Sequence, residues 1–150
     1  MTNAFSLEAR ALRYLARREY SRLELERKLA VSSPAPTLAE ISVLLDGLEQ
    51  RGFLSDRRVV EQVIQMRKHK FGNQRIVHEL KQKGIDANLI DTILPDLKKT
   101  ELNAAYSVWQ KKFKAFPINI KERGKQTRFL MSRGFSMTVI NQVFSRTDQE

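Results

Sequence analysis

The chain of 150 residues contains no cysteine, which excludes disulfide bonds, thiolate zinc sites and cysteine nucleophiles. No apolar run approaches the roughly 20 residues that span a bilayer. The first residues also lack the basic and apolar segments of a secretory signal. We therefore expect a soluble protein of the cytoplasm that has no contact with a membrane.

Catalytic motifs are absent as well. The sequence has no glycine-rich phosphate loop, no dinucleotide fingerprint, no nucleophile elbow and no carboxylate cluster with nuclease spacing. The two histidines, His69 and His78, have no ligand-spaced partners, so we expect no metal, no cofactor and no catalytic residue. The sequence thus indicates a binding protein, and a divergent metal-dependent nuclease is the enzymatic alternative.

Strand signals are also missing, because no segment keeps an alternation of apolar and polar residues and no hairpin turn joins β-branched runs. Instead, one passage occurs twice: residues 84–94 align without a gap with residues 134–144. Each copy predicts a helix end, a left-handed glycine cap at Gly84 or Gly134, and a short second helix. We expect Gly84 to lie where the second and third units join.

A more diverged copy is predicted upstream, where residues 24–29 align with residues 79–84 at an offset of 55 positions. Each copy follows a further amphipathic pattern, so three helices are expected in each unit and nine in the chain. We expect an all-α fold of three tandem three-helix repeats, at residues 1–54, 55–97 and 98–150, forming an elongated, curved rod. Such a row suits a polymer better than a small molecule.

Positive charge is the second strong signal, since 27 Lys and Arg residues oppose 17 Asp and Glu residues. The balance is +1 in residues 1–55 (8 basic, 7 acidic), +2 in residues 56–97 (8 and 6) and +7 in residues 98–150 (11 and 4). A surplus of this size favours a polyanionic partner, because neutralised phosphates release condensed counterions. For any single cation, the alternative is an ordinary solvated helix face.

The basic side chains expected to contact DNA or a partner filament lie in the two later units. They are Arg67, Lys68, Lys70, Arg75, Lys81, Lys83, Lys121, Lys125, Arg128 and Arg133. The densest passage, residues 67–75, spans a glycine turn. We expect Asn73 to cap the helix that follows, whose free N–H groups would bind a phosphate.

Aromatic residues are concentrated in the last third of the chain. Tyr106, Trp109 and Phe113 fall on one helical stripe, so we expect them in the core, with base stacking as the alternative. Phe116 and Pro117 are expected in a loop, where they would form an exposed contact.

These features together resemble the RecX family of bacterial regulatory proteins. The resemblance runs from about Leu7 to Phe144 and rests on the order and spacing of short landmarks. They are residues 11–21, Glu24-Leu25-Glu26-Arg27-Lys28-Leu29, Gly52-Phe53-Leu54-Ser55-Asp56-Arg57-Arg58, Lys70-Phe71-Gly72, Glu79-Leu80, Lys83-Gly84-Ile85, Arg128-Phe129-Leu130 and Arg133-Gly134-Phe135. One departure is Val59-Val60, where the family often has an aromatic residue.

The resemblance implies a regulator of DNA repair, homologous recombination and the SOS response that binds the RecA filament on DNA. It implies inhibition of RecA ATP hydrolysis, of strand exchange and of the RecA coprotease activity that cleaves a repressor. The expected partners are RecA and single-stranded DNA, with double-stranded DNA as a further candidate, and we expect a monomer. The alternative is a helical protein that binds DNA or RNA independently of RecA.

Overall fold

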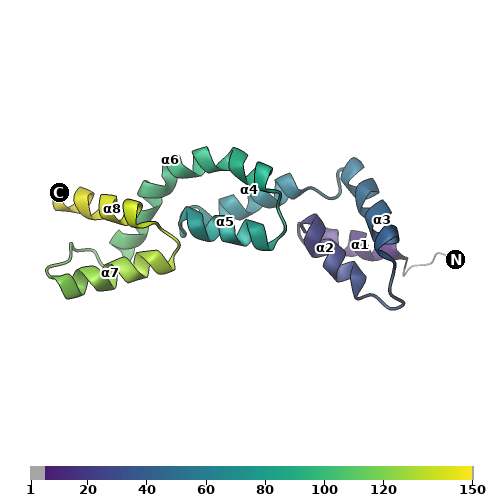
Figure 1. Ribbon diagram of the computed structural model, residues 1–150, viewed down its shortest axis with the longest axis horizontal. Helices are drawn as coiled ribbons and strands as arrows, with labels where there is room; N and C mark the ends of the chain where they lie inside the picture. The colour runs from purple at the N-terminus through teal and green to yellow at the C-terminus, as the bar shows by residue number, and fades with distance from the viewer. Residues whose placement is uncertain (1–5, 150) are drawn as a thin grey trace. The chain divides into compact units, whose positions relative to one another are not determined.

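The structure is a computed structural model that describes residues 6–149, the side chains of residues 147–149 excepted. Eight α-helices follow one another in this part of the chain, and it contains no β-strand. They are α1 (Leu7–Arg17), α2 (Arg22–Ala30), α3 (Leu38–Gln50), α4 (Asp56–Arg67), α5 (Asn73–Gln82), α6 (Ala87–Lys112), α7 (Ile120–Ser132) and α8 (Met137–Gln149) (Figure 1). The predicted all-α fold is confirmed.

The chain divides into two compact units. Unit 1 comprises the residues up to 62 together with residues 82–85, and unit 2 comprises residues 63–81 together with the chain from residue 86 onward. The core of unit 1 is formed by α1, α2 and α3 with the segments beside them. Its buried side chains are Ala11, Tyr20, Leu25, Leu29, Ile41, Leu45, Leu48 and Leu54.

The helices of unit 1 begin at hydroxyl caps. The side chains of Ser6, Ser21 and Thr37 each accept a hydrogen bond from the backbone N–H three residues later, at 3.1–3.2 Å. At Ser21 the cap is reciprocal, because the Glu24 carboxylate accepts the Ser21 N–H at 2.9 Å. These local sequence signals fix where the helices start.

The number of helices differs from the prediction, because α6 runs as one helix of 26 residues through Pro95. The expected end of one repeat and start of the next are therefore fused, and eight helices replace the expected nine in residues 6–149. Burial explains the continuity: Ile90, Leu97 and Ala104 are buried at intervals of seven residues on both sides of the proline. A continuous helix keeps them on one side, which offsets the hydrogen bond that Pro95 cannot donate.

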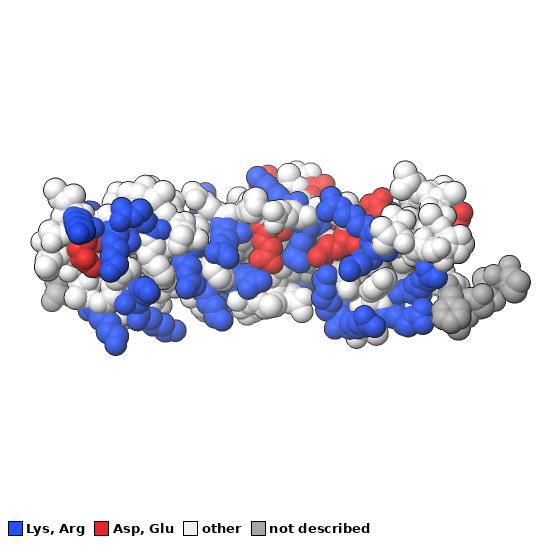
Figure 2. Space-filling view, turned by 90° about the horizontal axis from the view of Figure 1, so that it is seen from below, with Lys and Arg blue, Asp and Glu red and all other residues white. Residues whose placement is uncertain are grey.

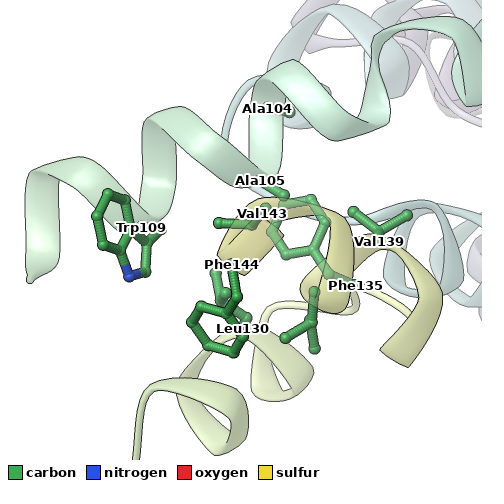
Figure 3. Close-up of a cluster of buried hydrophobic side chains, with 9 residues drawn as sticks. Ala104, Ala105, Trp109, Leu130, Phe135, Val139, Val143 and Phe144 are labelled. Carbon is green, nitrogen blue, oxygen red and sulfur yellow. The ribbon is translucent and has the colours of Figure 1, made fainter. Parts of the chain in front are cut away.

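The core of unit 2 lies where α6, α7 and α8 meet (Figure 3). Its buried side chains are Ala104, Ala105, Trp109, Leu130, Phe135, Val139, Ile140, Val143 and Phe144. The Trp109 indole donates a buried hydrogen bond of 2.7 Å to the Gln126 side-chain oxygen, and the Gln126 amide donates to the Ala115 carbonyl at 3.2 Å. The prediction that Trp109 belongs to the core is confirmed.

The two predicted glycine caps are confirmed, with φ of +77° at Gly84 and +91° at Gly134. Each glycine also lies tightly against a neighbouring helix. A Cβ atom on Gly84 would lie 2.6 Å from Cδ2 of Leu23, and one on Gly134 would lie 2.5 Å from Cβ of Arg75. Gly84 was expected to lie where the second and third repeats join. This was wrong, because Gly84 packs against Leu23 of α2 in unit 1.

The register of the first repeat also differs from the prediction. The buried Leu25 and Leu29 of α2 correspond to the buried Ile76 and Leu80 of α5, which lie 51 positions later in the chain. The offset of 55 was therefore wrong by about one helical turn. The pattern of charged side chains in positions 24–29 favoured an offset of 55. The buried leucines of α2 instead align with the buried residues of α5 at an offset of 51.

Candidate nucleic-acid interface

Three of the expected contact residues gather around one aromatic ring in unit 2. The guanidinium carbon of Arg75 lies 4.1 Å from the centre of the Phe71 ring, that of Arg133 lies 5.3 Å away and that of Arg67 lies 5.8 Å away. Their charges are attracted by the face of the ring. Of these three arginines, only Arg67 is paired with a carboxylate of the described residues, since its Nε lies 3.1 Å from Oε1 of Glu79.

Arg133 also belongs to a neighbouring hollow in unit 2, which we call the Phe129 groove. The groove has a volume of about 380 Å³. It is lined by His69, Lys70, Val108, Lys111, Lys112, Phe129 and Arg133. The Phe129 ring is held edge-on against Phe113, with ring centres 5.4 Å apart, so the aromatic wall of the groove is fixed by the core beneath it.

The Phe129 groove is strongly positive. Lys112 Nζ and the Arg133 guanidinium carbon lie 5.6 and 5.2 Å from the centre of the Phe129 ring. No acidic residue lines the groove, and none of its four cations forms an ion pair with a described carboxylate. Figure 2 shows a face of the molecule on which Lys and Arg side chains far outnumber Asp and Glu side chains. The groove offers charge and an aromatic surface to an anionic ligand with planar rings.

Lys121, Lys125 and Arg128 form a separate basic stripe along α7. All three are exposed, and their spacing of four and three residues places them on one face of the helix. Arg128 lies over Gly124, since a Cβ atom there would be 3.1 Å from its Nη1. The stripe can contact a phosphate backbone, but no aromatic side chain interrupts it.

The remaining expected residues are dispersed. Lys68 is half-buried and has no described ion pair, and Lys81 is exposed beside His78 in a different hollow of unit 2. Lys83 is half-buried in unit 1, where its Nζ lies 3.1 Å from Oε2 of Glu24. Burial acts to raise the pKa of Glu24, but the hydrogen bonds from Ser21 and Lys83 and the nearby positive charges outweigh it and lower this pKa. The charge of Lys83 is thus neutralised by Glu24 within unit 1.

The phosphate site expected at the start of α5 is contradicted by the structure. Asn73 is the first residue of α5 and not its cap. The Asn73 N–H donates to Oε2 of Glu101 at 2.9 Å, and the Gly72 and Gln74 N–H groups donate to the Arg133 and Gly134 carbonyls at 2.7 and 3.2 Å. A buried carboxylate and two carbonyls therefore occupy the position that a phosphate would need.

The same arrangement occurs at the start of α2. The Arg22 N–H donates to Oδ1 of Asp56 at 2.8 Å, and the Ser21 hydroxyl donates to the Lys83 carbonyl at 2.6 Å. Burial raises the pKa of Asp56, and it raises that of Glu101, although each carboxylate accepts a backbone N–H. The backbone N–H groups at the starts of α5 and α2 therefore bind other parts of the same chain.

The expected exposed contact at Phe116 and Pro117 was also wrong. Pro117 is buried and Phe116 is half-buried, with its ring edge-on to Phe144 at 6.2 Å. The exposed apolar side chains here are instead Ile118 of the loop and Ile120 at the start of α7, which are 89% and 90% accessible. Because a loop composition does not determine which side chains reach the core, the sequence selected the wrong pair.

Two further sequence expectations concern ligands and membranes. Among the side chains that the structure describes, those of residues 6–146, His, Asp and Glu do not gather in any group of three that could hold a metal ion. In the same part of the chain, no helix is both long enough and apolar enough to cross a bilayer. His69 and His78 are both exposed in unit 2 and line different hollows.

Sequence reasoning missed Lys111 and Lys112, which supply two of the cations of the Phe129 groove. The available signal was their position between Trp109 and Phe113 on a helix whose apolar stripe was recognised. Two adjacent lysines beside such a stripe point away from the core, at the edge of the buried face. Only the packing of α7 against α6 brings Phe129 and Arg133 to them.

Nearly the whole chain matches known proteins of one family. Residues 55–94 and 99–144 match the family descriptions of the second and third three-helix domains of RecX. The regulatory protein RecX of Leptothrix cholodnii is 47% identical over 145 residues, covering 97% of this chain and 91% of that protein. RecX of Ralstonia pickettii is 38% identical over 144 residues, covering 96% and 89%.

A solved structure shares the fold. The crystal structure of RecX from Lactobacillus salivarius superposes with a TM-score of 0.82 at 22% identity, and the match covers 96% of each chain. At this identity the likeness concerns the fold, whereas the curated relatives establish the family. The chain belongs to the RecX family of regulatory proteins, which are not enzymes.

Proposed function

We propose that this protein regulates the RecA filament on DNA, lowering RecA ATP hydrolysis, strand exchange and coprotease activity. The observation that carries the proposal is the Phe129 groove, a hollow with four cations and no acidic lining residue in a RecX-family chain. The RecX resemblance supplies RecA as the partner. The charge and the aromatic wall of the groove supply a physical means of holding DNA while the protein contacts the filament.

The groove suits phosphates because Lys70, Lys111, Lys112 and Arg133 have no competing carboxylate within it. Each cation that neutralises a phosphate releases a condensed counterion, so the binding energy depends on salt. Arg133 is positioned by the rings of Phe71 and Phe129, which limits the freedom that it loses on binding. A regulator held in this way adds stabilising contacts to the filament without any covalent step.

The proposal is tested by titrating the protein into a cognate RecA that hydrolyses ATP on single-stranded DNA. We expect the rate of ATP hydrolysis to fall as the protein is added. The double variant Lys111→Gln/Lys112→Gln should need about tenfold more protein for the same inhibition, because two phosphate contacts are removed. Unchanged ATP hydrolysis in the presence of the wild-type protein would contradict the proposal.

A matched control is available on the same helix. Lys98 and Lys99 are also adjacent, exposed lysines of α6, but they lie outside the Phe129 groove. The variant Lys98→Gln/Lys99→Gln removes the same charge and should inhibit RecA almost as well as the wild-type protein. Equal loss in both double variants would mean that net charge, and not the groove, carries the effect.

The second candidate is binding to DNA or RNA without RecA. The aromatic wall formed by Phe129 favours it, because unpaired bases stack on such rings whether or not a second protein is present. This function predicts tight binding to naked single strands, with a salt slope of roughly −0.7 per contacted phosphate. Strong binding to single strands combined with unchanged RecA activity would select this function.

A further inference from the structure

The basic side chains of unit 1 are of two kinds. Those of the first kind are each paired with a carboxylate of unit 1: Arg18, Arg22, Arg51, Arg58 and Lys83. Those of the second kind have no ion pair with any described carboxylate: Arg10, Arg13, Arg17, Arg27, Lys28 and Arg57. The ion pairs of the first kind engage the carboxylates of Glu8, Glu19, Glu24, Asp46 and Glu49. The cations of the second kind have no such partner among the described residues, so they remain available to an anionic ligand.

Four cations of the second kind line one hollow, which we call the α1–α2 groove. Its lining residues are Arg10, Arg13, Tyr14, Arg17, Lys28, Val31, Ser32 and Ser33, and its volume is about 530 Å³. None of them is acidic. The three arginines follow one another at intervals of three and four residues, so they share one face of α1, and α2 contributes Lys28.

The geometry of the groove is held by the fold. The Arg10 guanidinium donates to the Ser33 carbonyl at 3.4 Å, which joins α1 to the loop after α2. The half-buried Tyr14 ring packs edge-on against the buried Tyr20, with ring centres 5.6 Å apart. Lys28 Nζ lies 5.9 Å from the centre of the Tyr14 ring. The groove thus combines cations with an aromatic wall that the core supports.

We propose that the α1–α2 groove binds the phosphodiester backbone of a single-stranded nucleic acid, with Arg13 and Arg17 on its phosphates and Tyr14 stacked on an unpaired base. The two arginines project one helical turn apart, about 6 Å along α1. Their planar guanidinium groups match phosphate oxygens in pairs. This site goes beyond the proposed function, which uses cations of unit 2, and it can exist whether or not the protein acts on RecA.

An acidic protein segment is the competing occupant, because carboxylates would also neutralise these cations. The nucleic acid is favoured by Tyr14, since a carboxylate side chain has no planar ring to stack on it, whereas every base has one. Positively charged side chains surround the Tyr14 ring, which suits a nucleobase because each nucleobase is linked to a negatively charged phosphate. The two occupants therefore differ in what they require of Tyr14.

The experiment measures the affinity of the full chain for a labelled single-stranded oligothymidine by fluorescence anisotropy over a range of salt concentrations. The variant Arg13→Gln/Arg17→Gln removes two contacts, so the salt slope should shrink by roughly 1.4. At about 0.05 M salt this corresponds to roughly eightfold in affinity for each contact and roughly sixtyfold for the pair. No RecA is present, so the result is independent of the proposed function.

The matched control is Arg27→Gln/Arg57→Gln, which removes two exposed arginines of unit 1 that lie outside the groove and have no ion pair with a described carboxylate. The control should keep the slope and the affinity of the wild-type protein. Tyr14→Phe should also keep the affinity, whereas Tyr14→Leu should weaken it by roughly 5- to 150-fold through lost stacking. Thermal unfolding of each variant, followed by circular dichroism, checks that the fold is intact.

Two results would overturn the inference. One is an equal loss of affinity in the groove variant and in its control, which would mean that only total charge matters. The other is unchanged oligothymidine binding in Arg13→Gln/Arg17→Gln while binding of a labelled polyglutamate is lost, which would assign the groove to an acidic protein segment.

Discussion

Replacing Glu101 by glutamine or by alanine separates the hydrogen bond of this residue from its charge. The side chain is buried, and its carboxylate accepts the Asn73 N–H at 2.9 Å at the start of α5. Alanine leaves that N–H without an acceptor, at a cost of about 1–3 kcal/mol. For a chain of this size the cost corresponds to a Tm lower by about 2–12 °C.

Glutamine should behave differently, because its side-chain oxygen can accept the same N–H without a buried charge. Burial raises the pKa of Glu101 above its ordinary value of 4.5, so the ionised form is less favourable in the folded than in the unfolded chain. The associated stability is fully present below the unfolded pKa and is lost as the pH rises through the folded pKa. We therefore expect Glu101→Gln to equal or exceed the wild-type Tm at pH 7.

The assay is thermal unfolding followed by circular dichroism for the three proteins, from about pH 4, near the ordinary pKa of a glutamate, up to about pH 7. The Tm of Glu101→Gln relative to the wild-type protein should rise with pH, and Glu101→Ala should stay below both at every pH. A glutamine variant as unstable as the alanine variant would refute the reasoning, because the charge itself would then stabilise the fold.

Two further predictions concern stability. Gly52→Ala should cost only backbone strain, about 1–2 kcal/mol, because φ is +80° and no described atom beyond the adjacent residues lies within 4 Å of the added methyl group. Gly134→Ala should lower the Tm clearly more, since its Cβ would also lie 2.8 Å from the Arg75 backbone nitrogen; equal losses would contradict this contact. Glu24→Gln should lower the Tm at pH 7, because the fold lowers the pKa of Glu24 and so favours its ionised form. This stabilisation is present above about pH 4.5 and is lost as the pH falls through the pKa of the folded state. A Tm difference that persists at about pH 2–3 would show that the Lys83 ion pair is not its origin.

The local elements of the fold could be predicted from sequence. The helical caps at Ser21 and Thr37 and the glycines at 84 and 134 act on their immediate neighbours, so their signals are visible in short windows. The expected end of one helix and start of the next between residues 97 and 98 was wrong, because burial on both sides of Pro95 outweighs one lost hydrogen bond and keeps α6 continuous. That balance depends on contacts with residues far away in the chain.

The candidate interface was predictable only in part. Arg67, Arg75 and Arg133 were recognised as cations, but their common position around Phe71 depends on packing between helices. Charge counting failed for the first 55 residues, whose balance of +1 conceals the α1–α2 groove. A count along the chain treats every acid as a neighbour of every base, whereas Coulomb interactions depend on distance in space.

By itself, the sequence determined an all-helical chain with a repeated unit, glycine turns and a large positive charge, because these features follow from short-range backbone preferences and composition. The tertiary structure decided which charges are cancelled and which stay available. Arg51 pairs with Glu8 across 43 positions, and Arg58 pairs with Glu19 across 39. Pairs so distant in sequence form only when helices pack, and they leave the cations of the two grooves without acidic partners among the described residues.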